Sequence, residues 1–312
     1  MENKLEKIII DPIVPFFVHD KWHEKIELYQ LTYNHKVFSY HYLKDFFHLS
    51  VHDAEDALKK LQVFLENKVY LDELKTEHFL RDLPNSIAFF ARGVFSHQSP
   101  HPTPFLLKNQ ELVHYKNLKL SSFQSKRLKI KMDEAGISEL FDHEENFQPL
   151  IEDQIELVLD FNQTLKAIDI HHLKKIIDHH PLKDQILYLE DPLKAHDYHH
   201  LNKDELSLIG LDESLHQLVL HDKHLLENIS WMVIKPSLYS YQFIHDLLQK
   251  DKNISISASY ESPSIYRAFM PFIEQSKKNI HGLSTFNIYP DEFIKPYLEH
   301  LAPMSSDELL IL

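Results

Sequence analysis

The sequence of 312 residues has no cysteine and only four glycines. Without cysteine there can be no disulfide, no thiolate zinc site, no iron–sulfur cluster and no cysteine nucleophile, so any metal must be held by oxygen or imidazole ligands. The glycines, Gly93, Gly136, Gly210 and Gly282, are too scattered for a dinucleotide fingerprint or a Walker loop, in which clustered glycines let phosphate approach backbone N–H groups. NAD and ATP cradles of these types are therefore excluded.

Positive charge and long apolar runs are also scarce. Lys+Arg number 33 against Asp+Glu 47, which gives a formal net charge of −14. Because binding to a phosphate backbone is driven by Lys and Arg, nucleic acid is not an expected partner. The apolar run near the N-terminus is interrupted by Asp11 and two prolines, so it lacks the length of a signal-peptide core or a membrane span. We expect a cytoplasmic protein without a membrane partner.

The first hundred residues predict a small α+β domain. Two stretches rich in Ile, Val, Phe and Tyr, at 8–18 and 25–42, are typical of strands. An amphipathic run begins at Asp53, and a second helix is expected from about 85 to 95.

From residue 104 the pattern changes to short apolar runs separated by helical or polar stretches. There are eight such runs, at 105–107, 128–132, 156–162, 186–192, 208–214, 232–237, 254–260 and 283–289. Their spacing suits one strand plus one crossover helix, the repeating unit of a parallel (β/α) barrel. An open doubly wound sheet and a helical repeat are alternative interpretations, but neither explains where the charges fall.

Five successive runs, the second to the sixth, carry a charged residue at or near their C-terminal end. These residues are Lys131, Asp160, Glu190, Asp212 and Lys235. A lone charge inside a packed strand would be costly, whereas the C-terminal ends of barrel strands are where such a fold places its chemistry. We therefore predict an α/β fold with a modified (β/α)8 TIM-type barrel over 101–289.

The charges in these runs predict a metal site. Lys129 and Lys131 lie two positions apart on one expected strand, so both side chains point to the same face. Asp160, Glu190 and Asp212 end the next three strands and would form an arc of oxygen ligands, which suits Mg²⁺. Mn²⁺ is an alternative occupant.

Lys235 ends the sixth strand, four places around from the second in a ring of eight, so it would lie across the barrel from the Lys129/Lys131 pair. A substrate held at the metal would then lie between lysines. This layout fits proton abstraction next to a carboxylate by a lysine of lowered pKa. The expected partner is therefore a small-molecule carboxylate.

At these residues the sequence resembles a known family. The segments LKIKM, LVLDFNQ, YLEDPL, LDES and VIKPS are similar to the barrel-strand motifs of the enolase superfamily. The Lys-x-Lys pair with a lysine on the sixth strand resembles the muconate-lactonizing subgroup, and VIKPS followed by ISISASYES and HGLST looks most like the o-succinylbenzoate synthase family. The resemblance covers about 104–289. It implies that residues 1–100, completed by part of the tail at 290–312, form a capping domain over the barrel.

The same resemblance implies an activity and residue roles. The activity is that of a Mg²⁺-dependent lyase of menaquinone biosynthesis, which dehydrates 2-succinyl-6-hydroxy-2,4-cyclohexadiene-1-carboxylate to o-succinylbenzoate. Lys131 would be the base and then the acid that assists loss of hydroxide, with Lys129 supporting it electrostatically. Lys235 would be a cation–π partner on the opposite face of the ring, and Ser262 would contact a substrate carboxylate. The residues expected around the metal are the ligands Asp160, Glu190 and Asp212 and the neighbouring Asn162 and Glu213.

Two other functions stay open. An N-acylamino acid racemase or dipeptide epimerase of the same superfamily would use lysines on opposite faces of the substrate as two bases. A non-catalytic histidine-rich metal-binding protein is an alternative of another class, because the chain contains 24 histidines. The sequence leaves the oligomeric state open.

One histidine cluster has the spacing of a metal site. His196, His199 and His200 are at i, i+3 and i+4, which would place their rings on one face of a helix. Because no HExxH motif occurs and no nearby acid is placed to complete a catalytic zinc site, we interpret these histidines as solvated helix surface.

Overall fold

The computed structural model describes residues 4–13, 16–18, 21–43, 47, 49–67, 73–96, 111–116, 126–250, 252–276, 281 and 288–290. The chain begins with an antiparallel sheet in the order β1-β4-β5, formed by β1 (Lys4–Ile10), β4 (Ile26–Tyr33) and β5 (Lys36–His41). A separate pair, β2 (Phe16–Val18) and β3 (Lys21–His23), is also antiparallel. Asn34 and His35, between β4 and β5, both have positive φ, at 48° and 63°, as a tight two-residue hairpin requires.

Three helices follow the N-terminal sheet: α2 (Val51–Glu66), α3 (Glu73–Arg81) and α4 (Asn85–Ser96). The predicted helices at Asp53 and at 85–95 are confirmed as α2 and α4. Ser50 caps α2 because its hydroxyl accepts the N–H of Asp53 at 3.1 Å. Helix α3 was not predicted, since its apolar pattern is weak: Leu74 is 82% exposed, and Leu80 is the residue it buries.

The larger part of the molecule is a seven-stranded parallel sheet whose order follows the chain. Its strands are β6 (Glu111–His114), β7 (Arg127–Lys131), β8 (Glu156–Asp160), β9 (Ile186–Glu190), β10 (Ile209–Leu211), β11 (Trp231–Ile234) and β12 (Asn253–Ile256). Strands β7 to β12 coincide with the second to the seventh predicted runs. The first run, 105–107, lies outside the described residues, and of the last run only 288–289 is described. The strand beside β7 is instead β6, which the sequence pattern did not reveal.

Helices connect these strands on the outside of the sheet. They are α5 (Glu134–Phe141), α6 (Glu144–Glu152), α7 (Ala167–His179), α8 (Lys203–Leu206), α9 (Glu213–His221), α10 (Tyr241–Leu248) and α11 (Tyr266–Gln275), with 3₁₀ turns η3 (Pro181–Asp184), η4 (Ala195–His200), η5 (Lys223–Glu227), η6 (Pro236–Leu238) and η7 (Pro263–Ile265). A doubly wound sheet reverses its strand order at a switch point, whereas in this seven-stranded sheet each described strand lies beside the next one in sequence. The predicted barrel-type α/β fold is confirmed.

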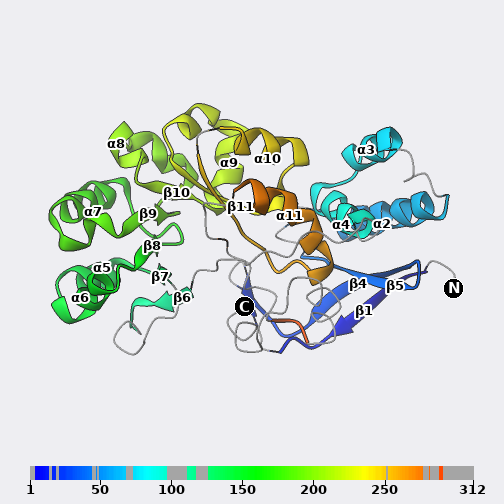
Figure 1. Ribbon diagram of the computed structural model, residues 1–312, viewed down its shortest axis with the longest axis horizontal. Helices are drawn as coiled ribbons and strands as arrows, with labels where there is room; N and C mark the ends of the chain where they lie inside the picture. The colour runs from blue at the N-terminus through cyan, green and yellow to red at the C-terminus, as the bar shows by residue number, and fades with distance from the viewer. Residues whose placement is uncertain are drawn as a thin grey trace.

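The N-terminal elements pack against the last helices of the barrel (Figure 1). Phe89 of α4 lies 5.9 Å, between ring centroids, from both Phe269 and Phe272 of α11. The Asn85 side-chain amide donates to the backbone oxygen of Leu238 at 3.1 Å. These contacts hold the N-terminal part beside the strands that carry the candidate site. No helix in the described ranges is long and apolar enough to cross a membrane.

Candidate active site

The predicted charged residues lie together at the C-terminal ends of five neighbouring strands. They are Lys131, Asp160 and Glu190, the last residues of β7, β8 and β9, and Asp212 and Lys235, the first residues after β10 and β11. The strand register explains the alignment, because Lys131 pairs with Asp160 and Asp160 pairs with Glu190 across the sheet. Parallel strands therefore bring side chains that are far apart in sequence to one edge.

The two lysines of β7 face the same way, as predicted from their spacing. Lys129 Nζ lies 3.0 Å from Asp160 Oδ2 and also contacts Glu190 Oε1. Lys131 Nζ lies 2.6 Å from the same Asp160 oxygen. Ile130, between them, points into the core and is fully buried. Burial opposes the charge on Lys129, but Glu190, Asp160 and Asp212 outweigh it and raise the pKa of Lys129 well above its usual value.

Glu190 is the most deeply buried carboxylate of the group, with 1% of its surface exposed. Burial raises its pKa to about 8; Lys129 opposes this shift, and the negative charges of Asp160 and Asp212 add to it. For Asp160, the two lysines overcome burial and lower the pKa. Among the described residues, Glu190 Oε2 has no hydrogen-bond partner. A buried carboxylate oxygen without a partner is costly, so this oxygen is suited to a cation.

The turn that carries Asp212 is held by a residue that sequence reasoning missed. Asp191 is buried, and its two carboxylate oxygens accept the backbone N–H groups of Asp212 and Ser214, each at 3.0 Å. Burial and the charge of Asp212 raise the pKa of Asp191 to about 7, against these two hydrogen bonds. The signal available in the sequence was the second acid of Glu190-Asp191-Pro192. Successive side chains of a strand point to opposite sides, so Asp191 could be expected to face away from the predicted ligand Glu190 and to have another role.

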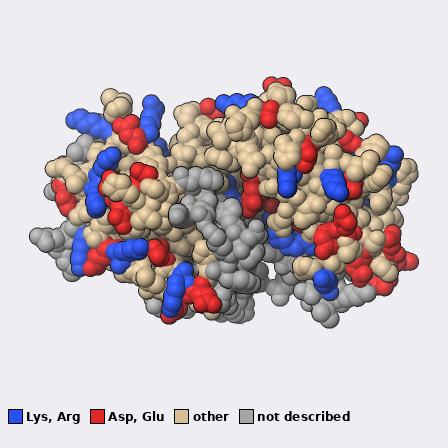
Figure 2. All heavy atoms as spheres, turned by 180° about the vertical axis from the view of Figure 1, so that it is seen from behind, with Lys and Arg blue, Asp and Glu red and all other residues tan. Residues whose placement is uncertain are grey.

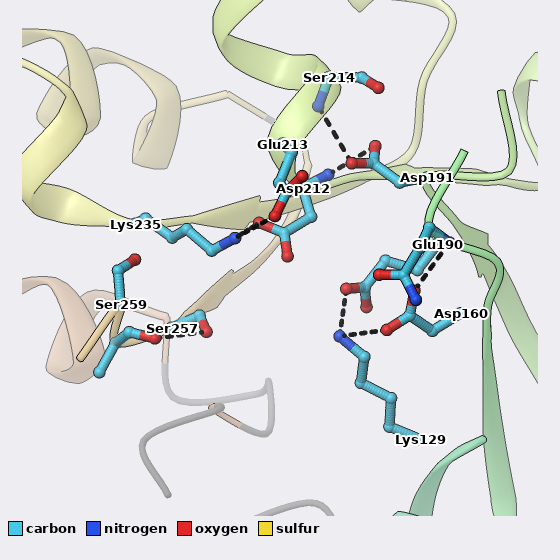
Figure 3. A network of polar contacts seen from close by, with 12 residues as sticks. Lys129, Asp160, Glu190, Asp191, Asp212, Glu213, Ser214, Lys235, Ser257 and Ser259 are labelled. Atoms are coloured by element: carbon cyan, nitrogen blue, oxygen red, sulfur yellow. Dashed lines mark hydrogen bonds and ion pairs between the residues drawn. The ribbon is translucent and has the colours of Figure 1, made fainter. Parts of the chain in front are cut away.

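Lys235 reaches the carboxylates from the other side (Figure 3). Its Nζ lies 2.6 Å from Asp212 Oδ1 and 4.0 Å from Glu213 Oε1. Lys235 is buried, and the attraction of Asp212 and Glu213 outweighs the burial that would lower its pKa, so the pKa is raised. Lys129 and Lys235 thus flank the carboxylates from two directions, as the barrel geometry predicted.

The remaining predicted residues fall into two groups. Asn162 and Glu213 lie at the site: Asn162 Oδ1 accepts a hydrogen bond from Lys131 Nζ at 2.9 Å, and Glu213 is half-exposed beside Lys235. Ser262 has other neighbours: it is buried, and its hydroxyl contacts the backbone oxygen of Ser39 and lies 2.7 Å from the Ser264 hydroxyl. The structure therefore brings eight of the nine predicted residues together and places Ser262 at the junction with the N-terminal sheet.

The residues at this site fit Mg²⁺. The charges of three carboxylates, Asp160, Glu190 and Asp212, all raise the pKa of Lys129, so the three groups lie around one ammonium group. Together they offer the oxygen-only donor set that Mg²⁺ prefers. The unpartnered Glu190 oxygen supports the same conclusion. Asp160, Glu190 and Asp212 would hold the ion, with Asp191 fixing the turn of Asp212.

Comparison with known proteins gives relatives by structure and not by sequence. No protein-family model and no curated protein sequence matches the chain. The o-succinylbenzoate synthase of Thermosynechococcus elongatus, solved with magnesium in its active site, superimposes with a TM-score of 0.61 at 16% identity and covers 96% of this chain and 99% of its own. The L-Ala-D/L-Glu epimerase of Bacillus subtilis gives 0.63 at 15% identity, over 92% of this chain and 90% of its own.

A third solved structure identifies the fold in general terms. A protein from Listeria innocua described as a member of the enolase superfamily superimposes with a TM-score of 0.56 at 12% identity, over 92% of this chain and 85% of its own. Identities this low establish architecture alone. The chain has the fold that these three solved structures share.

Proposed function

We propose that this protein is a Mg²⁺-dependent enzyme that removes a proton next to a carboxylate, and that its reaction is the dehydration of 2-succinyl-6-hydroxy-2,4-cyclohexadiene-1-carboxylate to o-succinylbenzoate. The observation that carries the proposal is the pair of lysine positions, Lys131 and Lys235, on two sides of the group of three carboxylates. The domains of this enzyme would be a cap of residues 1–100, completed by part of 290–312, and a catalytic barrel of 101–289.

The residues divide the chemistry between them. When bound, Mg²⁺ would supply positive charge that stabilises negative charge developing on the substrate carboxylate. Lys131, as a neutral amine, would take the proton from the carbon next to that carboxylate. It would then return this proton to the departing hydroxide, so that water leaves, the ring becomes aromatic and Lys131 is neutral again.

The other two lysines are better suited to electrostatic roles. Carboxylates raise the pKa of Lys129 well above its usual value despite burial, which favours its ammonium form over the neutral amine that a base needs. Lys235 is held as a cation in the same way by Asp212 and Glu213, and a desolvated cation over the ring is favourable. Ser262 as a substrate contact remains a prediction.

The comparisons support this proposal at the level of fold. One superimposed structure is an o-succinylbenzoate synthase complexed with magnesium, and that enzyme aligns over nearly the whole length of both chains. By the resemblance of the motifs, the proposal extends to menaquinone biosynthesis and a cytoplasmic location. Mn²⁺ would be an alternative ion, since it shares the preference for carboxylate ligands.

A dipeptide or N-acylamino acid epimerase is the second candidate. Two lysines on opposite sides can remove a proton from one face and deliver it to the other, and a dipeptide epimerase is among the superimposed structures. The two reactions place different demands on Lys235. Epimerization needs it to exchange a proton, whereas dehydration needs only its charge.

The experiment therefore assays both reactions on the full chain with Mg²⁺. Wild type is expected to aromatise the cyclohexadiene substrate, and Lys131→Ala to lose this activity. Lys235→Arg separates the candidates because arginine keeps the charge but stays protonated. With this substitution a dehydratase would retain measurable activity, whereas an epimerase would no longer convert one epimer into the other. Solvent deuterium entering a dipeptide or an N-acylamino acid, without dehydration, would replace the first candidate by the second.

A further inference from the structure

A second group of metal-binding side chains lies on the outer helical layer, away from the buried carboxylates. His199 is in η4, and Asp222 and His224 are at the start of η5. One ligand atom from each of the three lies within 4.8 Å of the other two. Both histidines are exposed and Asp222 is partly buried, so an ion from solvent can reach the group directly.

One distance in this group, between His199 and Asp222, matches the distance between two ligand atoms of a tetrahedral zinc ion. His199 Nε2 lies 3.3 Å from Asp222 Oδ2, and ligand atoms about 2.0–2.1 Å from a tetrahedral zinc ion are roughly 3.4 Å apart. The His199 and His224 rings are nearly parallel, at 29°, with their centroids 6.0 Å apart. The ligand atoms of the three residues lie within 4.8 Å of one another. Because the His224 side chain is exposed, it can rotate between staggered rotamers and bring its ligand nitrogen closer to the other two.

The ligand set selects the kind of ion. Two imidazoles and one carboxylate suit Zn²⁺ and related transition ions, whereas Mg²⁺ prefers oxygen ligands and keeps its waters. We propose that His199, Asp222 and His224 form a Zn²⁺ site with a fourth position open to water. This site differs in chemistry from the carboxylate group at the strand ends, and the proposal does not depend on the enzymatic function.

The structure replaces the histidine cluster expected from the sequence with a different one. The sequence placed His199 with His196 and His200 on a helix face without a suitable acid. The segment is instead a 3₁₀ turn, and His196 lies 3.6 Å from its neighbour Asp197. The acid and the second imidazole come from Asp222 and His224, which only the fold brings near.

A Zn²⁺ ion here would join two consecutive strand–helix units. Turn η4 belongs to the connection after β9, and η5 to the connection after β10. These two strands carry Glu190 and Asp212 of the candidate active site. An ion that binds the folded state alone stabilises it. Zn²⁺ is therefore expected to stabilise the packing of these two connections against each other.

The test is calorimetric titration of the full, chelator-treated chain with ZnSO₄ in excess Mg²⁺. Wild type is expected to bind one more Zn²⁺ than His199→Ala or His224→Ala, and its melting temperature is expected to rise with Zn²⁺ by more than theirs. His196→Ala is the matched control, because it removes an exposed imidazole from the same turn. Asp160→Asn, which alters the strand-end carboxylates, is expected to retain the extra Zn²⁺.

Co²⁺ provides a spectroscopic readout of the same site. Bound to wild type and to His196→Ala, it should give the visible absorption of a nitrogen- and oxygen-ligated site, and this signal should disappear in His199→Ala. Zn²⁺ stoichiometry that is unchanged in both His199→Ala and His224→Ala would overturn the proposal. So would an equal loss in His196→Ala, because binding would then be shared among surface histidines.

Discussion

The two lysines of β7 at the candidate site, Lys129 and Lys131, have the same side chain in different surroundings. The Lys129 side chain is 15% exposed and contacts both Asp160 and Glu190. The Lys131 side chain is 35% exposed and contacts Asp160 alone among the carboxylates. A base must lose its proton and reach the substrate, so fewer carboxylate contacts and greater exposure favour Lys131. The environment, and not the residue type, distinguishes the two roles.

Replacing Lys131 should remove the base without unfolding the protein. We expect Lys131→Ala, and equally Lys131→Arg, to lower kcat of the dehydration by about 10²- to 10⁴-fold, because arginine does not release its proton. Lys126→Ala is the control, since this exposed lysine just before β7 donates to the Asp153 backbone oxygen. Steady-state kinetics at saturating Mg²⁺ measures the difference, and a Lys131→Arg enzyme with wild-type kcat would contradict the assignment.

Asp191 is expected to act on the metal site through the turn that it holds. Asn in its place offers one acceptor oxygen for the two backbone N–H groups of Asp212 and Ser214. We predict that Asp191→Asn weakens Mg²⁺ binding by about 10- to 100-fold, as for other groups that orient metal ligands. Calorimetry gives the affinity, and Asp184→Asn, at an exposed position in η3, is the control. Restored kcat at high Mg²⁺ would identify a positioning role.

At the scale of strands and helices, the sequence predicts what depends on local pattern. Strand β8 is buried along both faces, with Leu157, Val158 and Leu159 fully buried, and such strands appear as apolar runs. A charge ends five of the eight predicted runs and marks the site edge, so the candidate ligands could be located without a structure. The pairing of His199 with Asp222 could not, because it depends on how two helical connections pack. Helix α3 was missed because it buries little apolar surface.

Gly210 provides a test of how strands β9 and β10 pack. A Cβ atom there would lie 2.2 Å from Tyr188 Cδ2. The Tyr188 ring is buried and stacks on Trp231, with the ring centroids 4.7 Å apart. We expect Gly210→Ala to lower the free energy of unfolding by about 1–3 kcal/mol through overpacking. Urea denaturation measures the loss. The exposed Lys203→Ala should stay within about 0.5 kcal/mol of wild type, and equal stability of the two variants would show that Tyr188 can move.

At the scale of the whole molecule, buried contacts join the N-terminal part to the barrel. On the face shown in Figure 2, acidic and basic side chains are mixed over most of the described residues, and several acidic ones gather at the lower right of the view. The junction between the N-terminal sheet and the barrel is polar as well as apolar. His41 of β5 is buried, and its Nδ1 lies 2.6 Å from both the Tyr260 backbone oxygen and the Tyr289 hydroxyl.

This junction should make the protein sensitive to acid. Burial lowers the pKa of His41 from 6.5 to about 4, against its hydrogen bond to Tyr260. The unfolded chain therefore binds the proton first as the pH falls, so the contribution of His41 to stability is complete above pH 6.5 and is lost as the pH falls toward 4. The loss amounts to about 3 kcal/mol for such a shift.

His41→Gln removes this titration while keeping a polar side chain at the junction. We expect the free energy of unfolding, measured with urea at a series of pH values, to fall less steeply below pH 6.5 in His41→Gln than in wild type. The exposed His172→Gln should follow the wild-type profile. His281, whose pKa burial also lowers to about 4, stays in every variant and leaves a residual acid dependence. Parallel profiles for His41→Gln and wild type would mean that His41 is protonated equally in the folded and unfolded states, and that the junction does not set the acid limit of the fold.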